Sequence, residues 1–385
     1  MRQLLTLLLP ISLALSGCTT WPDRIPHTEA QAAMAQVPGF ASIRYWADAP
    51  AATFTMMRED MAVDATIARP DTLLALSGGA DDGAYAAGFL KGWSDTGDRP
   101  QFTLVSGVST GALIAPFAFL GSDHDDKLRA FFTEISRKDI YRQRGIVGLL
   151  TRPSAADANP LKLLIAQNID SSLLDAIAIE HGRGRRLLVQ TTNLDAARGV
   201  IWDMGAIAQS THPHRLELFR EVLLASASVP GLFAPVMIEV TGSDEERFSE
   251  MHVDGATTAG FLAVPESMAL SRDHKSRTGQ DRIFVIMNGR LRPQYELVEA
   301  SIFPIITRAL STVLSAHDRS ILVNVQNFAA NNDIGFAMSY IGADFDFETD
   351  ELFSQPYMNA LYDHGIERGR AGDWSNSVDE AQNTP

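Results

Sequence analysis

The 385-residue sequence contains a single cysteine, Cys18, and this scarcity excludes whole classes of protein. One cysteine cannot form an intrachain disulfide, and it cannot supply the thiolates of a multi-cysteine metal site. Basic residues are also in the minority, since 32 Lys and Arg stand against 47 Asp and Glu, for a formal net charge of -15. A chain this acidic repels phosphate backbones, so we expect no nucleic-acid partner.

Long apolar runs, short repeats and low-complexity segments are lacking as well. The apolar stretch at the N-terminus covers only twelve residues, Leu4–Leu15, which is shorter than the ~20 residues of a membrane-spanning helix. It is typical of a secretory signal over residues 1–17, and small residues lead from Leu15 directly to Cys18. An ordinary signal peptide with a chance cysteine, or a buried N-terminal helix, would give a similar pattern.

The segment that ends at Cys18 resembles the lipobox of bacterial lipoproteins. This resemblance implies that the Cys18 sulfur carries a diacylglyceryl group and that Cys18 becomes the new N-terminus after cleavage. We therefore expect a membrane partner through an N-terminal lipid anchor, without a crossing of the bilayer. The expected location is the bacterial cell envelope, at the outer membrane or facing the periplasm.

The rest of the chain indicates one α/β domain. Prolines punctuate residues 18–69, which we interpret as a lipidated N-terminal tether and extension. Over residues 70–372, short apolar runs alternate with longer amphipathic stretches, as in a mostly parallel sheet flanked by helices in three layers, α/β/α. Residues 373–385 are predicted to be a loose C-terminal tail. The predicted strands are 72–77, 102–106, 186–192, 200–204, 236–240, 248–253, 282–288 and 334–341, and the predicted helices are 83–93, 110–120, 127–134, 161–167, 172–181, 215–225, 305–328 and 356–370.

Ser109 lies in a Gly-x-Ser-x-Gly pattern between a predicted strand and a predicted helix. This is the context of a nucleophile elbow, a turn so sharp that its flanking positions have no room for side chains. Gly107 and Gly111 occupy these flanking positions. The helix that follows would place its N-terminal N–H groups beside Ser109, where they favour developing negative charge. Pro116 is expected to kink or end this helix early.

Two further segments could complete a site around a serine. The turn at Gly78, Gly79 and Ala80 follows an apolar strand, and its backbone amides could hold a phosphate or an oxyanion, although a plain strand-to-helix turn would look the same. It lacks the Gly-Lys-Ser/Thr of a Walker loop. Asp254 ends another strand and is followed by Gly255 and Ala256. A carboxylate there could take a proton directly from a serine.

Four blocks in this order resemble the patatin-like phospholipases, over about residues 71–372. The blocks are Ser77-Gly-Gly with Gly83-Ala84, Gly107-Val-Ser-Thr-Gly111, Ala225-Ser-Ala-Ser-Val-Pro-Gly-Leu-Phe-Ala-Pro235 and Asp254-Gly255-Ala256. The resemblance implies a lipid acyl hydrolase, of phospholipase A or lysophospholipase type, that acts on carboxylic ester bonds of phospholipids or lysophospholipids. It implies that Ser109 is the nucleophile, that Asp254 is the general base, and that the amides of Gly78, Gly79 and Ala80 form the oxyanion hole. It implies no metal and no organic cofactor.

The glycine-rich loop departs from the family pattern at two positions. Ala80 replaces the third glycine, and Asp82 stands where the family has a basic residue. A positive φ at Ala80 would cost about 1 kcal/mol, because a Cβ crowds the backbone there. We expect the Asp82 side chain to point outward or to cap the helix that begins at Gly83. These departures motivate an alternative in which the chain is a non-catalytic envelope lipoprotein that retains the fold.

A second alternative is a Ser-His-Asp carboxylesterase. The order Ser109, Asp254, His317 fits the chain order of α/β-hydrolases, and His252 shares a strand face with Asp254. Each histidine, however, stands without a supporting motif. The acid limb of the pH–rate profile is expected to separate the two mechanisms, since an aspartate base titrates near or modestly above ~4 and a histidine near ~6.5.

Overall fold

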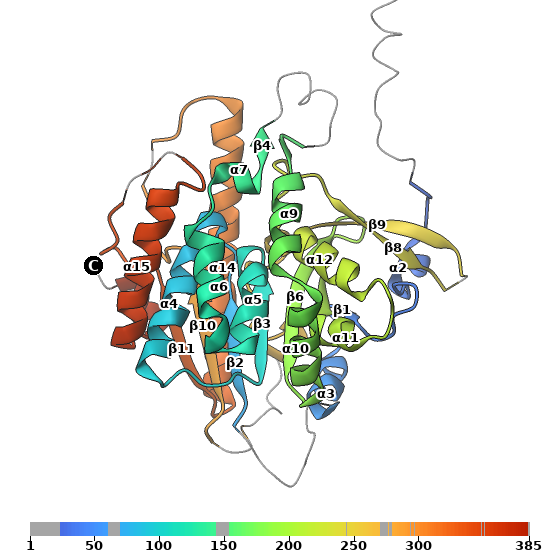
Figure 1. Ribbon diagram of the computed structural model, residues 1–385, viewed down its shortest axis with the longest axis horizontal. Coiled ribbons are helices and arrows are strands. Elements are labelled where there is room, and N and C mark those ends of the chain that lie inside the picture. The colour runs from blue at the N-terminus through green and yellow to red at the C-terminus, as the bar shows by residue number, and fades with distance from the viewer. Residues whose placement is uncertain are drawn as a thin grey trace, which may run out of the picture.

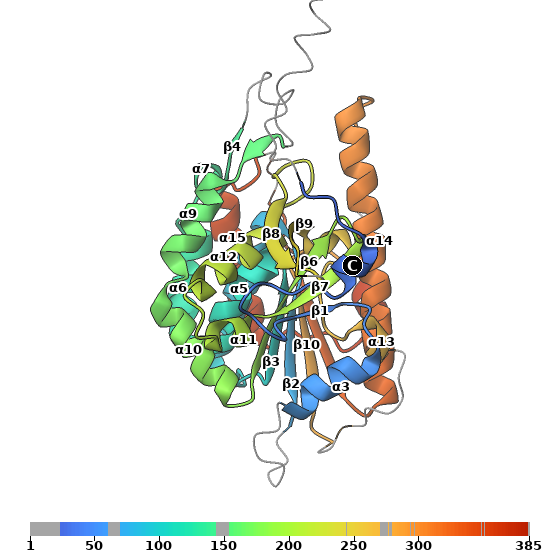
Figure 2. The same cartoon turned by 90° about the vertical axis from the view of Figure 1, so that its right-hand side faces the viewer.

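A nine-stranded sheet lies between two layers of helices (Figures 1 and 2). The structure is a computed structural model and describes residues 24–60, 70–143 and 154–383, apart from positions 244, 270–275, 277, 278, 293, 296, 348 and 350. The predicted signal segment and Cys18 lie outside the described residues.

The centre of the sheet is parallel, which confirms the predicted fold class. Strands β6, β3, β2, β10 and β11 pair in parallel in that order, and β1, β7, β8 and β9 add antiparallel pairs at one side. The strands are β1 (Arg44–Trp46), β2 (Thr72–Leu76), β3 (Leu104–Val108), β6 (Arg186–Asn193), β7 (Arg198–Asp203), β8 (Val236–Thr241), β9 (Arg247–Asp254), β10 (Arg282–Met287) and β11 (Gly335–Tyr340), and a separate ribbon joins β4 (Arg142–Gln143) to β5 (Ala156–Asp157).

The helices cover both faces of the sheet. Figure 2 shows α5, α6, α9, α10 and α12 on one face and α13 and α14 on the other. The helices are α2 (Glu29–Ala33), α3 (Ala51–Asp60), α4 (Gly83–Thr96), α5 (Thr110–Leu120), α6 (Asp125–Thr133), α7 (Arg137–Ile140), α9 (Asn159–Asn168), α10 (Ser171–Gly182), α11 (Met204–Gln209), α12 (Arg215–Ser226), α13 (Glu266–Ala269), α14 (Ile302–Asn331), α15 (Gln355–Ala371) and α16 (Val378–Asn383), and the short 3-10 helices are η1 (Ala80–Asp82), η2 (Ser122–His124) and η3 (Gly255–Thr257).

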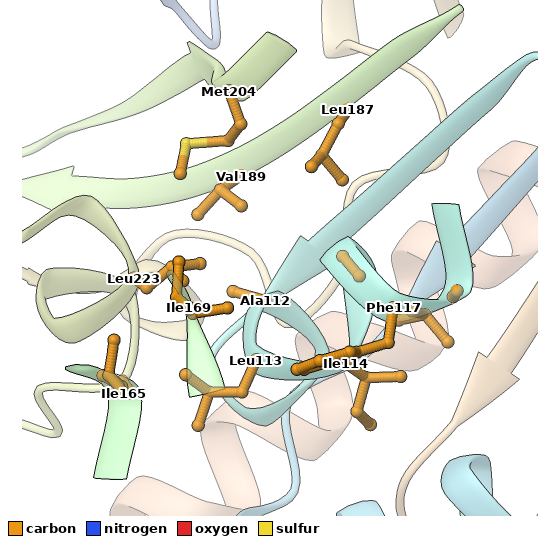
Figure 3. Close-up of a cluster of buried hydrophobic side chains, with 14 of the residues drawn as sticks. Ala112, Leu113, Ile114, Phe117, Ile165, Ile169, Leu187, Val189, Met204 and Leu223 are labelled. Atoms are coloured by element: carbon orange, nitrogen blue, oxygen red, sulfur yellow. The ribbon is translucent and has the colours of Figure 1, made fainter. Parts of the chain in front are cut away.

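Helix α5 is enclosed by hydrophobic side chains, because its sequence is apolar on every side. Its neighbours in the core come from β6, α9, α11 and α12, and they include Leu187, Val189, Ile165, Met204 and Leu223 (Figure 3). The expectation that Pro116 ends this helix early is wrong, since α5 continues to Leu120. Packing on all sides of the helix outweighs the one backbone hydrogen bond that a proline removes.

Both ends of the described chain pack on the domain. Residues 24–60, which we expected to form a tether and extension, add β1 to the edge strand β7 and bury Ile43 and Phe54. The predicted loose tail is wrong for residues 378–383, which form α16. Val378 and Ala381 are buried against the core between the sheet and α14, so hydrophobic contact orders this segment.

Strands β3 and β9 approach each other along the same edge of β6. β3 runs parallel to β6 and ends where Val108 pairs with Gln190, while β9 runs antiparallel and ends where Asp254 pairs with Thr191. The two strands therefore point at each other and stop at adjacent positions of β6. Whatever follows Val108 is brought beside Asp254.

Candidate active site

Ser109 occupies a sharp turn at the junction of β3 and α5. Its backbone has φ 55° and ψ -124°, a conformation that a residue with a Cβ rarely adopts. Glycines on both sides make the turn possible. A Cβ at Gly107 would lie 2.3 Å from the Gly111 carbonyl oxygen, and a Cβ at Gly111 would lie 2.3 Å from the Leu76 carbonyl oxygen. The turn therefore requires the two glycines that the sequence provides.

The Ser109 hydroxyl donates a hydrogen bond to Asp254, from Oγ to Oδ2, at 2.6 Å. The two residues are 145 positions apart in the chain. The other carboxylate oxygen, Oδ1, accepts the backbone N–H of Ala256 at 2.8 Å. A Cβ at Gly255 would lie 2.4 Å from the Gln190 carbonyl oxygen, so glycine is needed for the chain to turn there. The carboxylate is thus held between the serine and the start of η3.

Burial raises the pKa of Asp254 to about 7, and the hydrogen bonds from Ser109 and Ala256 offset only part of this effect. Asp254 is 2% exposed and Ser109 is 7% exposed, so little water reaches the pair. A carboxylate with this pKa is a stronger base than an ordinary aspartate. The expectation that an aspartate base would titrate near or modestly above ~4 does not hold here, because burial raises the pKa of Asp254 close to that of a histidine, and the acid limb does not separate the two mechanisms.

No histidine of the described residues hydrogen-bonds Ser109 or Asp254. His252 is fully buried, but its Nδ1 lies 2.9 Å from Thr191 Oγ1 and its Nε2 lies 3.1 Å from Glu250 Oε2. His317 lies on α14, and no contact joins it to the serine.

The loop after β2 lies against the serine. A Cβ at Gly78 would lie 3.1 Å from the Ser109 Cβ, and a Cβ at Gly79 would lie 2.1 Å from the Asn288 carbonyl oxygen. The Gly78 N–H donates to the Gly260 carbonyl at 2.9 Å, so our inclusion of Gly78 among the oxyanion donors is wrong. Within the described chain, no hydrogen bond takes up the N–H of Gly79 or Ala80. These two amides remain as donors for an oxyanion.

Ala80 adopts a positive φ of 51°, the condition under which its Cβ is strained. Thr110, the residue after the serine, donates from Oγ1 to the Ala80 carbonyl at 2.6 Å and ties this loop to the start of α5. The alanine is therefore kept in a conformation that glycine adopts more easily.

The expectation that Asp82 caps α4 is wrong, because its side chain is engaged by another helix. Its Oδ1 accepts the Tyr357 hydroxyl from α15, and no cap hydrogen bond forms from its side chain. Burial raises the pKa of Asp82 to about 7. The neighbouring Asp81 accepts the Phe353 N–H at 2.8 Å. Both acidic side chains of the loop therefore accept hydrogen bonds from α15 or from the residues just before it.

Two supporting residues were missed by the sequence analysis. The Ser226 hydroxyl accepts the Ser109 N–H at 3.0 Å and donates to the Gln190 carbonyl at 2.7 Å, which holds the strained turn on β6. Asn288, at the end of β10, donates from Nδ2 to the Ser77 carbonyl at 2.8 Å and braces the loop that carries Gly79. Ser226 belongs to a block that we expected only to shape the pocket, whereas no sequence signal marks Asn288.

Metal binding and membrane crossing find no support in the described residues. Among them, no group of His, Cys, Asp and Glu side chains is arranged to hold a metal ion. Within the same part of the chain, no helix has both the length and the hydrophobicity to cross a bilayer.

Comparison with known structures gives distant similarities. VipD from Legionella pneumophila is 12% identical, with 80% of this chain and 67% of that chain covered and a TM-score of 0.39. The type III effector ExoU from Pseudomonas aeruginosa is 12% identical, with 81% and 56% covered and a TM-score of 0.34. Human GIVD cytosolic phospholipase A2 is 10% identical, with 69% and 49% covered and a TM-score of 0.30. The chain spans about half to two thirds of the length of these proteins.

The sequence itself matches one protein family. No curated protein matches the chain at a significant level. A family model described as patatin-like phospholipase matches residues 74–266, half of the chain, and the matched range contains the serine turn, the glycine loop and Asp254. The chain therefore belongs to the patatin-like phospholipase family.

Proposed function

We propose that this protein cleaves carboxylic ester bonds of phospholipids or lysophospholipids through a Ser109–Asp254 dyad. The observation that carries the proposal is the 2.6 Å hydrogen bond from the serine hydroxyl to a buried carboxylate with no imidazole between them. Family membership supports a lipid ester as the substrate class.

In the proposed first half-reaction, Ser109 Oγ attacks the ester carbonyl carbon while Asp254 takes the hydroxyl proton. The carbonyl oxygen becomes an oxyanion, which the N–H groups of Gly79 and Ala80 stabilise. The carbon–oxygen bond to the leaving alcohol then breaks, and Asp254 returns the proton to that alcohol. A fatty acyl group remains on Ser109 as an ester.

In the second half-reaction, water replaces the alcohol. Asp254 takes a proton from the water as its oxygen attacks the acyl carbon, and the same two amides stabilise the second oxyanion. The bond to Ser109 Oγ breaks, the serine regains its proton from Asp254, and a fatty acid leaves. The nearly complete burial of the pair limits the water that competes for the carboxylate.

We further propose that the chain is anchored to a membrane of the bacterial cell envelope through a lipid on Cys18. The support is the sequence alone, in which the only cysteine follows an apolar stretch and a run of small residues. Two or three long acyl chains hold a protein on a membrane firmly, since each buried methylene contributes about 0.8 kcal/mol. Mass spectrometry of the N-terminal peptide from membrane fractions tests this, and an unmodified Cys18 thiol there would contradict it.

The hydrolase proposal is tested with the full chain in detergent. Wild type, Ser109→Ala and Asp254→Asn are incubated with mixed phospholipids, and the products are identified by mass spectrometry. We expect wild type to release fatty acids and both variants to lose at least about a hundredfold in rate. Ser320→Ala, a change at an exposed serine of α14, is the matched control and should retain the wild-type rate.

A fluorophosphonate probe separates this proposal from a non-catalytic lipoprotein. The probe should label wild type and Asp82→Asn but not Ser109→Ala. Failure to label folded wild-type protein would refute the dyad. Such a failure would favour the non-catalytic lipoprotein, the alternative that the departures at Ala80 and Asp82 motivate.

A further inference from the structure

The first half of α14 extends past the sheet on the side of Ser109. β10 ends at Met287 and α14 begins at Ile302, so the helix starts at the carboxyl ends of the parallel strands, where β3 delivers Ser109. Its 30 residues measure about 45 Å, whereas the 6 residues of β10 measure about 20 Å. Figure 2 shows the beginning of α14 projecting beyond the sheet.

Five large apolar side chains on this projection are exposed to solvent. We call this set the α14 stripe: Ile302, Ile305, Ile306, Leu310 and Val313, which are 74%, 52%, 59%, 48% and 64% exposed. Ile302, Ile306, Leu310 and Val313 follow one another at intervals of four, four and three residues, and Ile305 directly precedes Ile306, so all five lie on one side of the helix. Just before the helix, Tyr295 and Leu297 are 93% and 86% exposed. Contiguous exposed apolar surface of this kind marks an interaction site.

The stripe precedes the half of α14 that packs on the sheet. Leu322 follows Val313 by nine residues, or two and a half helical turns, and therefore lies on the opposite side of α14. Leu322 is fully buried in the core between α14 and the sheet, together with Val325 and Ala329. Leu310, in contrast, lies in line with the buried Phe328, which follows it by 18 residues or five turns. The stripe is therefore exposed because it precedes the packed half of the helix, and this exposure makes it available to a partner outside the domain.

The low charge of the stripe region favours an apolar partner. Between Glu299 and Asp318 the only charged side chain is Arg308, in a chain whose formal net charge is -15. The first described residue, Arg24, pairs with Asp195 in the turn that follows β6, also at the carboxyl end of the sheet. The proposed anchor at Cys18, six residues earlier, would therefore reach a membrane on the side where α14 projects.

A second contact connects α14 to the catalytic loop. Asp318, on the packed side of the helix, accepts the Gly260 N–H at 3.1 Å, and the Gly260 carbonyl accepts the Gly78 N–H at 2.9 Å. Gly78 lies beside Ser109, since a Cβ at Gly78 would be 3.1 Å from the Ser109 Cβ. The helix that bears the stripe is thus joined through two backbone groups to the loop that carries the oxyanion donors.

From these observations we infer that the α14 stripe is a lipid-docking surface, which lies in the headgroup and acyl boundary of the membrane that holds the substrate. An amphipathic helix binds in this way through its apolar face, aided by basic residues near anionic headgroups. The inference rests on the proposed function for its choice of a lipid partner. It adds a membrane contact that is separate from both the dyad and the Cys18 anchor.

Fluorescent labels on α14 test the docking directly. The full chain carries Ser109→Ala, so that no lipid is consumed, together with Ile306→Cys or the matched control Ser311→Cys on the opposite side of the helix. Each thiol is labelled with an environment-sensitive fluorophore, and the chain without an added cysteine corrects for any label on Cys18. The protein is reconstituted into vesicles of equal parts phosphatidylethanolamine and phosphatidylglycerol, with or without acyl-brominated lipid.

We expect brominated lipid to quench the label at position 306 at least about threefold more than the label at position 311, since only the first lies in the acyl region. Quenching at 306 that is no stronger than at 311 would overturn the inference. A blue-shifted, concentration-dependent signal at 306 without vesicles would also overturn it, because a second copy would then cover the stripe. Neither readout depends on hydrolysis, so failure of the proposed function leaves this test intact.

A kinetic arm uses the active chain. Ile306→Ser with Leu310→Ser should lower the rate on the same vesicles by about tenfold or more, because the lost apolar area weakens docking. Hydrolysis of a soluble short-chain ester should remain at the wild-type rate. An unchanged rate on vesicles would contradict the inference, and so would an equal loss on both substrates, which would place the effect in the fold.

Discussion

Replacing Asp254 by Asn should lower the rate of hydrolysis at least about a hundredfold and also make the protein more stable at alkaline pH. Burial raises the pKa of Asp254 to about 7 from an ordinary value of 3.8. A carboxyl whose pKa is higher in the folded state than in the unfolded state favours folding only while it is protonated. Its stabilising contribution is complete below pH 3.8 and is lost as the pH rises through about 7.

The size of this effect follows from the difference between the two pKa values. About three units, at about 1.4 kcal/mol each, correspond to a loss of about 4 kcal/mol. Asp254→Asn removes the charge and can keep both hydrogen bonds, since its amide oxygen can accept the Ala256 N–H and its NH2 group can donate to Ser109 Oγ. We therefore expect the variant to match wild type near pH 4 and to exceed it by up to about 4 kcal/mol at alkaline pH.

Urea unfolding followed by tryptophan fluorescence measures this difference at several values between about pH 5 and about pH 8.5. Asp82 and Asp318, whose pKa values burial also raises, are present in both proteins and largely cancel in the comparison. Ser109→Ala is the control, because it is inactive yet keeps the carboxylate and should not gain stability. A variant that is less stable than wild type at alkaline pH, or a difference that does not grow with pH, would refute the raised pKa.

Three further predictions concern the same site. Hydrolysis of a soluble ester should rise with pH and reach half of its maximum near pH 7, because Asp254 must be ionised to accept a proton, and a profile already flat at about pH 5 would rule this out. Ser226→Ala should lower the rate at least about tenfold and the unfolding free energy by about 1–3 kcal/mol, since the buried Ser109 N–H loses its acceptor. Ser228→Ala, which removes a hydroxyl that donates to the Leu224 carbonyl, should have a smaller effect on the rate. Ala80→Gly should raise the unfolding free energy by about 1 kcal/mol with activity retained, because it relieves the positive φ, and an unchanged urea midpoint would argue against strain there.

The sequence predicted those features that local geometry requires. A strand that turns abruptly into a helix needs glycines on both sides of its apex, so Gly107 and Gly111 made Ser109 visible. The strands of the parallel centre were visible as well, because burial on both faces leaves short, nearly continuous apolar runs such as that of β2. The pairing of Ser109 with Asp254 came from family resemblance, and the register of β3 and β9 on β6 now accounts for it.

Features that depend on distant segments could not be predicted. Nothing in the sequence indicates that the Gly78 N–H has a partner within the protein. It donates to the carbonyl of Gly260, a residue that lies well over a hundred positions later in the chain. Asp82 was predicted as a possible helix cap, but its carboxylate accepts a hydrogen bond from Tyr357 of α15, a helix that is distant in the sequence. The raised pKa of Asp254 results from its burial in the assembled domain, and the residues next to it in the sequence do not reveal how deeply it is buried.

The head-on meeting of β3 and β9 has a consequence for the time at which the protein becomes active. β3 leads directly into Ser109, and β9 ends at Asp254. The two side chains come within hydrogen-bonding distance only after both strands have paired with β6. A nascent or partly folded polypeptide therefore has no competent nucleophile, even after the serine turn has formed. Under the proposed function, lipid cleavage begins only when the tertiary structure is complete, so folding itself delays the onset of activity.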